Sequence, residues 1–572
     1  MKEELKIGIL VAAFFLVVIG GAALFLNSGV LAPGYPIESK VYTTLERTVV
    51  PVPVPLTAPA IYPYQVDNYS ENGYGIWRYG RGLAREKRTD LMPPGYTNTT
   101  ATNTAELLHY FTMADVHITD KESPAQAIFD GYRGGNIAAY SPVMLTTTQV
   151  LDAAIQTVNA LHKEKPFDFG IILDDAINQN QYNELRWYID VFDGKKIKPW
   201  SGMKGDPVPG PLNDYQDEYK AAGIAKTLTW YEVIGNHDQY WMGADVPNDY
   251  LKKTLVGGDI LNAGSSLADP DFLNERGFFM GSMNGTTPYG DVYGAGPSEN
   301  FTSPPKVIAA DPNRHSLSQS AWMSEFYNST TNPRGHGFSR ENVKTGFASY
   351  SFEPKAGIPI KIISLDDTMK DTLPNISTPY ALGSLDQERY DWLVQELESG
   401  QAEGKLMIIA SHVPIRDEPL NATGALWTTT SPVSEQQLIA KLHTYPNFVV
   451  WMAGHLHKNT VTAFKSPDES RPELGFWEVE TSSLRDFPQQ FRMFTIVRNT
   501  DNTVSVITTN VDPAFREGSF IMQSRSYAIA SHQLFNNYVD LLPTGSYNAE
   551  LVKPLSPEMQ VKIQNYGTSP KL

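Results

Sequence analysis

The sequence predicts an α/β sandwich, a fold in which β-sheets are covered by α-helices. Short apolar runs of six to eight residues recur along the chain, and polar, acidic or histidine residues follow each of them. Continuous apolar runs of this length are typical of strands that are covered on both faces. Helical patterns lie between the runs, and strands that alternate with helices indicate this fold class. The runs span residues 107–114, 167–173, 228–234, 360–365, 406–411 and 448–453.

The helices between the runs are predicted from apolar spacing and from capping residues. Residues 150–161 place apolar side chains on one face at helical spacing. Ser384 with Gln387, and Ser434 with Gln437, have the spacing of a capping box. We therefore expect a helix to begin directly after each of these two serines.

The composition excludes several classes of protein. The 572 residues include 46 Lys and Arg against 63 Asp and Glu, a formal net charge of −17, and 41% of them are hydrophobic. A disordered tail, a collagen-like fibre and a disulfide-stapled mini-protein do not have this composition. The acidic balance argues against a nucleic-acid polymer as a partner, because such binding depends on clustered Lys and Arg. The absence of Cys excludes disulfides, thiolate metal sites and cysteine nucleophiles.

Residues 7–26 form an uncharged apolar stretch of 20 residues near the N-terminus. As a helix this stretch would be about 30 Å long, which matches the hydrocarbon core of a bilayer. We predict an uncleaved single-pass anchor in the cell membrane, with residues 1–6 in the cytoplasm and the bulk of the chain outside. A signal segment cleaved after Ala32, which would give a secreted protein, and a buried core helix are the alternatives.

Changes of composition along the chain predict its domain organisation. Residues 27–104 are expected to form an extended Pro-rich stalk and an N-terminal extension. The main domain is predicted to span residues 105–512, with a loop-rich insertion at about residues 240–345 that is rich in Gly, Pro, Asn and Ser. Residues 513–572 form a C-terminal extension.

Five short blocks that contain Asp, Asn or His residues each come at or just after the end of an apolar run. A single Asp-x-His or His-x-His is expected by chance in a chain of this size, but five blocks in one order are not. Open α/β sheets bind ligands outside the carboxyl ends of their strands, so we expect the blocks to converge on one crevice. The blocks are Asp115-Val116-His117, Asp174-Asp175-Ala176-Ile177-Asn178, Gly235-Asn236-His237-Asp238, Ser411-His412 and Gly454-His455-Leu456-His457.

In this order the blocks resemble those of the calcineurin-like metallophosphoesterase superfamily, most closely its membrane-anchored bacterial and archaeal envelope-type members. The resemblance covers about residues 105–510, apart from the insertion. It implies a four-layer α/β/β/α sandwich around two metal ions. It places Asp115, His117, Asp175 and His457 on the first metal, and Asp175, Asn236, His412 and His455 on the second.

The chemistry of these side chains agrees with the resemblance. Carboxylate, amide and imidazole donors suit Mn, Fe, Co, Ni or Zn as divalent ions. Two such ions about 3.5–4 Å apart lower the pKa of a bridging water, and the resulting hydroxide can attack phosphorus. His237 is then left over as an imidazole that is not a ligand, placed to act as general acid or to stabilise charge.

The chain departs from the family pattern at two positions. Asp174 stands where the family has a glycine at a tight turn, and Asn178 stands where many relatives have an Asp that pairs with the catalytic histidine. We expect the amide oxygen of Asn178 to orient His237 without supplying a negative charge. Asp238, the last residue of its block, is assigned with His237 and Asn178 to the catalytic group.

Three further residues have weaker signals. Arg485 and Arg492 follow the Gly-His-x-His block and are candidates for contacts with substrate phosphate, although surface salt bridges are the commoner explanation. Asp120, three residues after His117, either supports the site or caps a turn.

The resemblance thus implies metal-dependent hydrolysis of a phosphate ester. It leaves open whether a monoester or a diester is the substrate, which metal pair is native, and which oligomeric state the chain adopts. A non-catalytic metal-binding or structural cell-surface protein on the same fold is the alternative.

Overall fold

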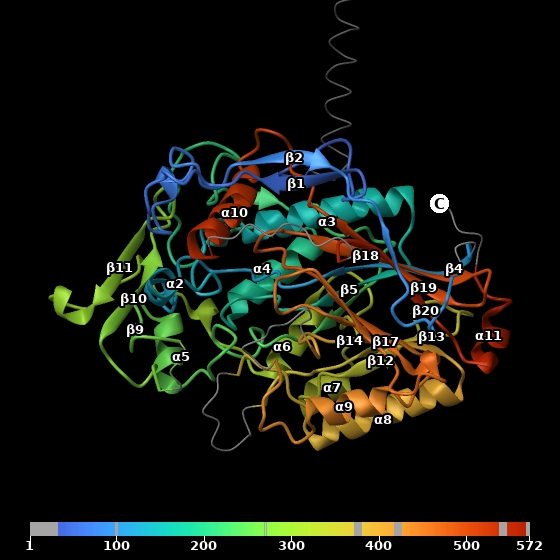
Figure 1. Cartoon of the computed structure of the whole chain (residues 1–572). Helices are drawn as coiled ribbons and strands as arrows, with labels where there is room; N and C mark the ends of the chain where they lie inside the picture. Colours follow the sequence, from blue (N-terminus) through green and yellow to red (C-terminus); the bar gives the residue numbers. More distant parts are fainter. Residues whose placement is uncertain are drawn as a thin grey trace, which may run out of the picture.

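Figure 1 shows a computed structural model of the chain, in which residues 33–97, 101–267, 269, 271–370, 380–416, 426–536 and 546–567 are described. These residues form a mixed α/β structure with five sheets. Two of the sheets, with seven and six strands, carry the candidate site, and the other three are small.

The larger sheet has the strand order β3-β20-β19-β18-β4-β5-β8. β4, β5 and β8 run parallel to one another, whereas β18 pairs antiparallel with both of its neighbours. The carboxyl ends of β4, β5 and β8 therefore lie at one edge of the sheet. The strands are β3 (Glu86–Arg88), β4 (Asn103–Met113), β5 (Phe169–Leu173), β8 (Trp230–Val233), β18 (Phe491–Asn499), β19 (Val504–Val511) and β20 (Asn548–Lys553).

The second sheet has the strand order β12-β13-β14-β15-β17-β16. Its four inner strands β13, β14, β15 and β17 are parallel, and the two edge strands β12 and β16 are antiparallel to their neighbours. The strands are β12 (Tyr350–Phe352), β13 (Ile360–Ser364), β14 (Leu406–Ala410), β15 (Phe448–Ala453), β16 (Thr460–Phe464) and β17 (Phe476–Glu480).

A hydrophobic core between the two large sheets holds them together. It includes Leu108 from β4 and Ile408 from β14, which are both buried. The Tyr110 hydroxyl lies 3.2 Å from the Met452 Sδ atom and so joins the two sheets. Each large apolar side chain buried in this way contributes about 1.5–3 kcal/mol to stability. This packing brings the loops at the ends of both sets of parallel strands together.

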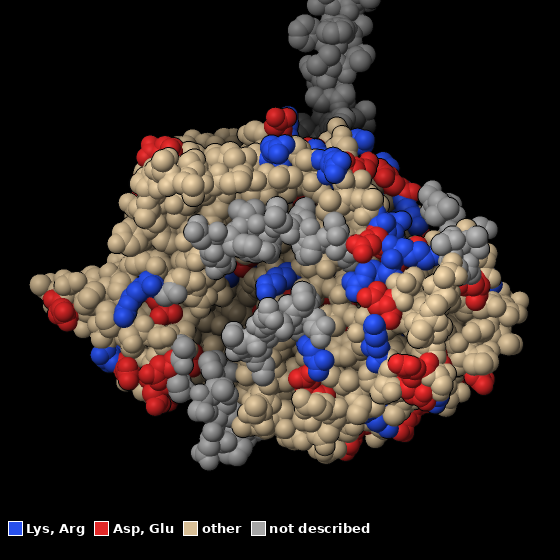
Figure 2. Space-filling model, viewed as in Figure 1, with Lys and Arg blue, Asp and Glu red and all other residues tan. Residues whose placement is uncertain are grey.

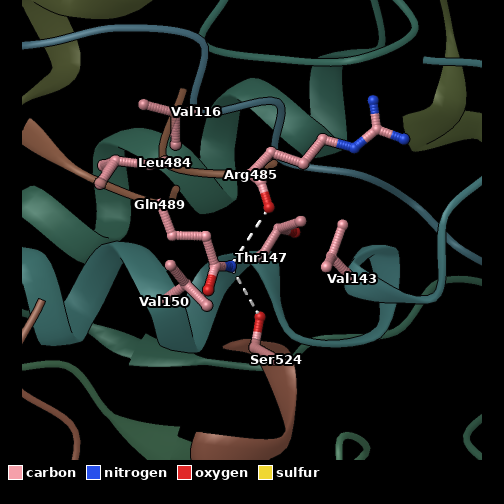
Figure 3. Close-up of a pocket in the computed structure, with 8 residues that line it drawn as sticks. All are labelled: Val116, Val143, Thr147, Val150, Leu484, Arg485, Gln489 and Ser524. Carbon is pink, nitrogen blue, oxygen red and sulfur yellow. Dashed lines mark hydrogen bonds between the residues drawn. The ribbon is translucent and has the colours of Figure 1, made fainter. Parts of the chain in front are cut away.

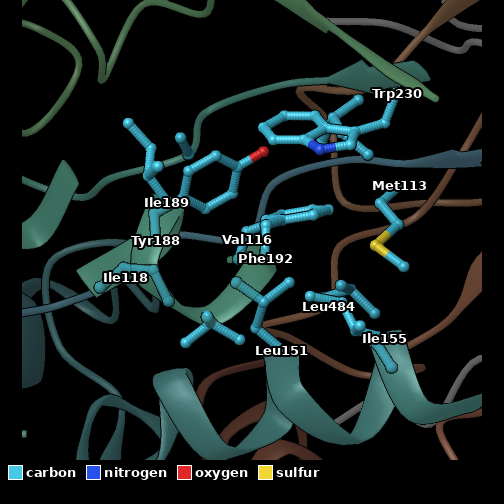
Figure 4. Packing of buried hydrophobic residues seen from close by; sticks show 14 of the residues in the cluster. Met113, Val116, Ile118, Leu151, Ile155, Tyr188, Ile189, Phe192, Trp230 and Leu484 are labelled. Atoms are coloured by element: carbon cyan, nitrogen blue, oxygen red, sulfur yellow. The ribbon is translucent and has the colours of Figure 1, made fainter. Parts of the chain in front are cut away.

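Two helices, α3 (Thr147–Glu164) and α4 (Tyr182–Phe192), pack on the outer face of the larger sheet. Figure 4 shows Leu151 of α3 and Phe192 of α4 packed against Trp230 of β8. The rings of Phe192 and Trp230 stack with their centroids 4.2 Å apart. Strand residues alternate between the two faces of a sheet, so β4 contributes Leu108 to one core and Met113 to the other.

Two further helices, α8 (Gln387–Ala402) and α9 (Glu435–Leu442), pack on the outer face of the second sheet (Figure 1). The capping box of Ser434 and Gln437 at the start of α9 is confirmed. The predicted cap of α8 is wrong, because the Asp386 side chain, and not Ser384, accepts the hydrogen bond from the first turn. An Asp is as good an N-cap as a Ser, so the two candidates could not be separated by residue type.

The remaining elements lie in the insertion, in the two extensions and in the connections of the main domain. β1 (Arg47–Pro51) pairs with β2 (Trp77–Arg81), and β6 (Lys196–Ile197) pairs with β7 (Tyr219–Lys220). The insertion contains a three-stranded sheet of β9 (Asn262–Ala263), β10 (Phe278–Met283) and β11 (Val292–Pro297). The other helices are α2 (Ile128–Gly134), α5 (Asp249–Val256), α6 (Gln319–Glu325), α7 (Arg340–Thr345), α10 (Met522–Asn536) and α11 (Pro557–Ile563). Short 3₁₀ turns are η1 (Val66–Asn68), η2 (Pro142–Leu145), η3 (Ser298–Asn300), η4 (Pro312–Arg314), η5 (Phe326–Asn328) and η6 (Pro472–Leu474).

Both extensions pack on the main body. Tyr35, in the predicted stalk, is buried, and its hydroxyl donates to the Asp214 carbonyl at 3.1 Å. β3 and β20, which lie outside residues 105–512, complete the larger sheet. The part of the stalk that the structure describes is therefore held against the body and does not extend away from it.

The predicted fold class, a four-layer α/β/β/α sandwich with a loop-rich insertion and an N-terminal transmembrane helix, is wrong as stated. The described residues form five sheets in a mixed α/β arrangement, and the insertion has a sheet and helices of its own. Among the described residues, no helix has both the length and the apolar character needed to cross a bilayer. Residues 7–26, on which the membrane prediction rests, lie outside the described residues.

Figure 2 shows one face of the molecule, which is hollowed near its middle. Lys and Arg side chains on this face are interspersed with Asp and Glu side chains. The described residues of this face therefore form no continuous basic stripe of the kind that follows a nucleic-acid backbone.

Candidate metal centre

The predicted ligands lie in loops that follow the carboxyl ends of five parallel strands. Three of these strands belong to the larger sheet and two to the second sheet. The loops carry Asp115 and His117 after β4, Asp175 after β5, Asn236 after β8, His412 after β14, and His455 and His457 after β15. We call these seven residues the candidate metal centre. Each sheet thus supplies part of it, and the core between the sheets fixes their separation.

Asp115, His117 and His457 form a first group of ligands. The Nε2 atoms of His117 and His457 lie 3.1 Å apart, and His457 Nε2 lies 3.2 Å from Asp115 Oδ1. One ligand atom from each of the three residues lies within 4.8 Å of the others, so the group could hold one cation.

Asn236, His412 and His455 form a second group on the other side of Asp175. His412 Nε2 lies 3.2 Å from His455 Nδ1 and 2.9 Å from Asn236 Oδ1. Together with Asp175, the two histidines could hold a second cation.

Asp175 lies between the two groups. Its Oδ2 atom is 3.7 Å from His117 Nε2 and 3.3 Å from His412 Nε2. Its other oxygen accepts a hydrogen bond from the His237 backbone N–H at 2.8 Å. One carboxylate oxygen therefore faces both groups, which is the position that a bridging ligand would take.

Hydrogen bonds outside the centre fix which atoms of these side chains face inward. His412 Nδ1 donates to the Leu173 carbonyl at 2.9 Å, so Nε2 of the neutral ring carries the free lone pair. The Asn236 amide nitrogen donates to the Gly243 carbonyl at 2.9 Å, which turns its oxygen toward His412. The orientation of these donors is thus set before any ligand arrives.

Five of the seven residues have backbone conformations that non-glycine residues rarely adopt. Asp115, His117, Asp175, His455 and His457 all have positive φ angles, between 48° and 84°. A residue held in this region costs about 1–3 kcal/mol, and such residues cluster at functional sites. The loops therefore store strain at the positions where the donor atoms converge.

Opposite charges favour each other inside the centre. Burial alone would raise the pKa of Asp175, but His412 and His237 hold it at about 2. Burial alone would lower the pKa of His412, but Asp175 and Asp115 raise it well above its ordinary value. Asp175 therefore stays ionised and attracts positive charge.

The two histidines of the Gly-His-x-His block differ in their surroundings. Burial alone would lower the pKa of His457, but Asp115 and Asp486 raise it to about 10. Burial lowers the pKa of His455 to about 3, and the neighbouring His412 adds to this effect. The His455 ring is therefore neutral at physiological pH and can act as a donor to a cation.

His237 lies at the edge of the centre, and its Nε2 atom is 4.0 Å from Asp175 Oδ2. His237 Nδ1 lies 2.8 Å from the Asn178 backbone carbonyl, to which it must donate. Asn178 therefore orients His237, but through its main chain and not through the predicted amide oxygen. That amide oxygen instead lies 3.4 Å from Arg485 Nη1. Burial lowers the pKa of His237, so the neutral ring with a free Nε2 is favoured.

Asp238, a predicted catalytic residue, contacts the backbone of its own turn. Its side chain is fully buried, and Oδ2 accepts a hydrogen bond from the Gly235 N–H at 2.9 Å. Burial, together with nearby Asp174 and Asp175, raises the pKa of Asp238 well above its ordinary value. Asp238 thus closes the turn that carries Asn236, and its assignment to the catalytic group stays a prediction.

The structure gives both candidate arginines internal partners. Arg492, in β18, is fully buried, and its Nη2 atom donates to Asn459 Oδ1, the Glu480 carbonyl and the Ser546 carbonyl at 2.9–3.0 Å. These bonds lie within the protein, while Nε and Nη1 have no hydrogen-bond partner among the described residues, so a substrate contact of Arg492 stays a prediction.

Arg485 is also buried, with 2% of its surface exposed. Its guanidinium group donates to the Ile137 and Ala138 carbonyls and reaches Asn178. In Figure 3 this group extends away from the small internal cavity that the rest of the residue lines. Arg485 therefore connects the loop at residues 137–138 with Asn178, which orients His237.

Two buried carboxylates beside the centre were not assigned from the sequence. Asp486 Oδ2 lies 2.6 Å from His457 Nδ1, and Asp367 accepts hydrogen bonds from the backbone N–H groups of His412 and Val413 at 3.2–3.3 Å. Asp486 directly follows the candidate Arg485, so the sequence analysis pointed to this loop but not to its carboxylate.

Comparisons with known proteins find similarity among solved structures. No family model and no curated protein matches the chain. A solved structure described as a dimetal phosphatase from Danio rerio aligns with a TM-score of 0.35 and 11% identity, over 71% of this chain and 97% of that chain. Similarity at this level carries no argument for fold or function, which rest on the geometry above.

Proposed function

We propose that the chain is a metal-dependent hydrolase of phosphate esters. The observation that carries the proposal is the position of Asp175 Oδ2, within 3.7 Å of an imidazole nitrogen from each of the two ligand groups. A carboxylate shared between two groups of imidazole and oxygen donors is the arrangement that a pair of divalent cations needs.

The donor atoms fit such cations. Two imidazole nitrogens on one tetrahedral or octahedral ion are separated by about 3.0–3.4 Å, since metal–nitrogen bonds are about 2.0–2.1 Å long. The nitrogen pairs of His117 with His457 and of His412 with His455 are 3.1 and 3.2 Å apart. In addition, the buried His117 Nδ1 has no hydrogen-bond partner among the described residues, so the polar contacts of this ring are made by Nε2, which faces His457.

Cations bound to these residues would supply Lewis-acid activation of water and of the phosphoryl oxygens. Asp115 and Asp175 bring two negative charges to the site, and Asp175 would hold both cations in place. His237 presents its free Nε2 atom beside Asp175, because the Asn178 carbonyl occupies Nδ1. This free Nε2 can take up a proton from solvent or from the attacking water, and can then pass it to the leaving oxygen of an ester.

The test is hydrolysis of p-nitrophenyl phosphate and bis(p-nitrophenyl) phosphate by the full chain. The metal content is measured in parallel, before and after treatment with a chelator. We expect about two divalent cations per chain and turnover that is lost with the chelator and restored by added Mn²⁺, Zn²⁺ or Co²⁺. In Asp175→Asn both cation content and turnover should fall, turnover by at least about 10³-fold.

Asp152→Asn is the matched control. Asp152 is a buried carboxyl group in α3 that accepts hydrogen bonds from the Ala222 N–H and the Gln156 amide. Burial raises its pKa to about 7, so a neutral amide is a mild change there. Two bound cations without turnover would contradict the proposal and indicate a binding protein, and a chain without cations would indicate a structural one.

A further inference from the structure

We propose that Asp486 is a positioning residue for His457, which holds that imidazole as a charge-assisted donor to the first of the two cations. The inference rests on the metal centre of the proposed function and assigns Asp486 a role within it. The first cation is the one that Asp115, His117 and His457 would hold.

The contact between the two side chains is short and buried. Asp486 Oδ2 lies 2.6 Å from His457 Nδ1, and Asp486 is 3% exposed. A carboxylate can only accept here, so a proton stays on Nδ1, and Nε2, which faces His117 and Asp115, is the nitrogen that can give up its proton and bind a cation. The other oxygen of Asp486 is buried and has no hydrogen-bond partner among the described residues. His457 is therefore the side chain to which Asp486 is hydrogen-bonded, while Arg485 and His532 lie close enough to interact with its charge.

The loop that carries Asp486 is tied to the centre through its main chain. The Ser483 hydroxyl donates to the Asp115 carbonyl at 2.7 Å and accepts hydrogen bonds from the N–H groups of Arg485 and Asp486 at 2.8 and 3.1 Å. Figure 3 shows that Gln489, on the far side of the loop, donates to the Arg485 carbonyl and to Ser524. The position of Asp486 is thus linked to the backbone of a ligand in the same group.

The two groups of ligands differ in the acceptor that a histidine Nδ1 atom contacts. His457 Nδ1 is bonded to a carboxylate, whereas His412 Nδ1 is bonded to the neutral Leu173 carbonyl. A negative acceptor makes the opposite nitrogen a stronger donor to a cation than a neutral acceptor does. Loss of the Asp486 charge should therefore weaken one cation site and leave the other unchanged.

The experiment is a Co²⁺ titration of the metal-free full chain, followed by calorimetry and by the visible absorption of bound Co²⁺. In Asp486→Asn we expect one of the two binding steps to weaken by about 10–100-fold, with a changed spectrum for that step only. Asp486→Ser, which removes the carboxylate without crowding the loop, should show the same loss. Asp152→Asn, the same substitution at a buried carboxyl in α3, should leave both steps as in the parent chain.

The outcomes separate this inference from the proposed function. Unchanged Co²⁺ affinity in both Asp486 variants would overturn the inference, as would equal weakening of both steps together with a lower melting temperature of the metal-free chain. A parent chain that binds two Co²⁺ ions but hydrolyses neither ester would overturn the proposed function, while selective weakening in the variants would still support the role of Asp486. A parent chain that binds no Co²⁺ would overturn both.

Discussion

Two buried carboxylates five residues apart in one loop, Asp115 and Asp120, have opposite electrostatic surroundings. Asp120 forms an ion pair with the buried Arg314, whose Nε lies 3.1 Å from Asp120 Oδ2. Its oxygens also accept hydrogen bonds from Asn183 and Ser201 at 2.8 and 2.7 Å. We call these four residues the Asp120 cluster.

Asp115 has no such partner. Among the described residues, neither Asp115 nor Asp175 forms an ion pair with Lys or Arg, and both face imidazole nitrogens instead. A buried carboxylate needs a compensating charge, because its transfer from water to the interior costs several kcal/mol. The Asp120 cluster contains its own Arg, whereas the carboxylates of the candidate metal centre face imidazoles.

The backbone shows the same contrast. Asp115 and His117 have positive φ angles, but no residue of the Asp120 cluster does. Strained conformations persist where the surroundings hold them, and they are concentrated at sites that act on ligands. The comparison indicates that both clusters bury charge. Of the two, only the candidate metal centre combines strained backbone with carboxylates that have no Lys or Arg partner among the described residues.

The largest expected difference is between Asp115→Asn and Asp120→Asn. Asp115→Asn should lower turnover by at least about 10³-fold and remove a bound cation, since a charged ligand is lost. Asp120→Asn should leave Arg314 buried without a counter-charge and cost about 3–5 kcal/mol of stability. Metal analysis, turnover per folded molecule and urea unfolding measure the three quantities. Equal loss of bound cations in Asp115→Asn and Asp120→Asn would contradict the expected difference between the two clusters.

Replacement of His237 tests whether this residue is a general acid or a ligand of the candidate metal centre. His237→Ala should keep both cations and lower turnover by about 10²–10⁴-fold, the usual contribution of a general acid. However, His237 also lies close enough to His117 and Asp175 for the three to hold a cation. Metal analysis of the variant distinguishes the two roles, because the loss of one cation would show that His237 is a ligand.

A smaller effect is expected from a side chain placed beside His237. Gly243 has a φ of +68°, and a Cβ atom there would lie 2.2 Å from His237 Cδ2 and 2.3 Å from the Asn236 amide nitrogen. Gly243→Ala should lower turnover by up to about 10²-fold through displacement of these groups. Gly357→Ala is the control, because Gly357 has a φ of +78° but open space around it. If the control loses as much turnover, backbone strain and not contact with His237 is responsible.

The smallest expected effect is on the pH dependence of stability. It comes from Lys553, a buried lysine that forms no ion pair among the described residues. Burial lowers the pKa of Lys553 to about 7, and its Nζ atom donates to the Glu473 and Gly475 carbonyls at 2.7 and 2.6 Å. In the unfolded chain the pKa of a Lys is about 10.4, so between pH 7 and 10 the unfolded state binds more protons. This group therefore makes the free energy of unfolding rise with pH across that window and remain level below it.

Lys553→Met should flatten the rise in stability between pH 7 and 10, as measured by urea midpoints at several pH values. The equivalent change in the Asp120 cluster, Arg314→Met, should lower stability at all these pH values, because it leaves Asp120 without its cation. An unchanged pH dependence in Lys553→Met would show that other groups produce it.

Much of the candidate site could be expected from local sequence patterns. His412 and His455 come directly after apolar runs, and the ends of parallel strands meet at one edge whatever the details of packing. The capping box of Ser434 and Gln437 is equally local, since the residues that form it are three positions apart.

Contacts between distant segments could not be expected in the same way. Asp486 bonds to His457, 29 positions away, and Arg492 is bonded by Asn459, 33 positions away. A carboxylate or a guanidinium group in a loop has no local pattern that tells a ligand contact from a structural one. The amide of Asn178 was expected to face His237 for this reason, but Arg485 faces it instead.

The sequence by itself determined which donor side chains follow the predicted strands, because donor residues at the ends of apolar runs form a pattern that depends on near neighbours. Only the tertiary structure decided the arrangement around them. It packed the two sheets so that Asp175 lies between the two ligand groups, and it paired Asp120 with Arg314 while leaving Asp115 without a cation. The physical reason is that the compensation of buried charge is a property of three-dimensional neighbours, which the order of residues along a loop does not specify.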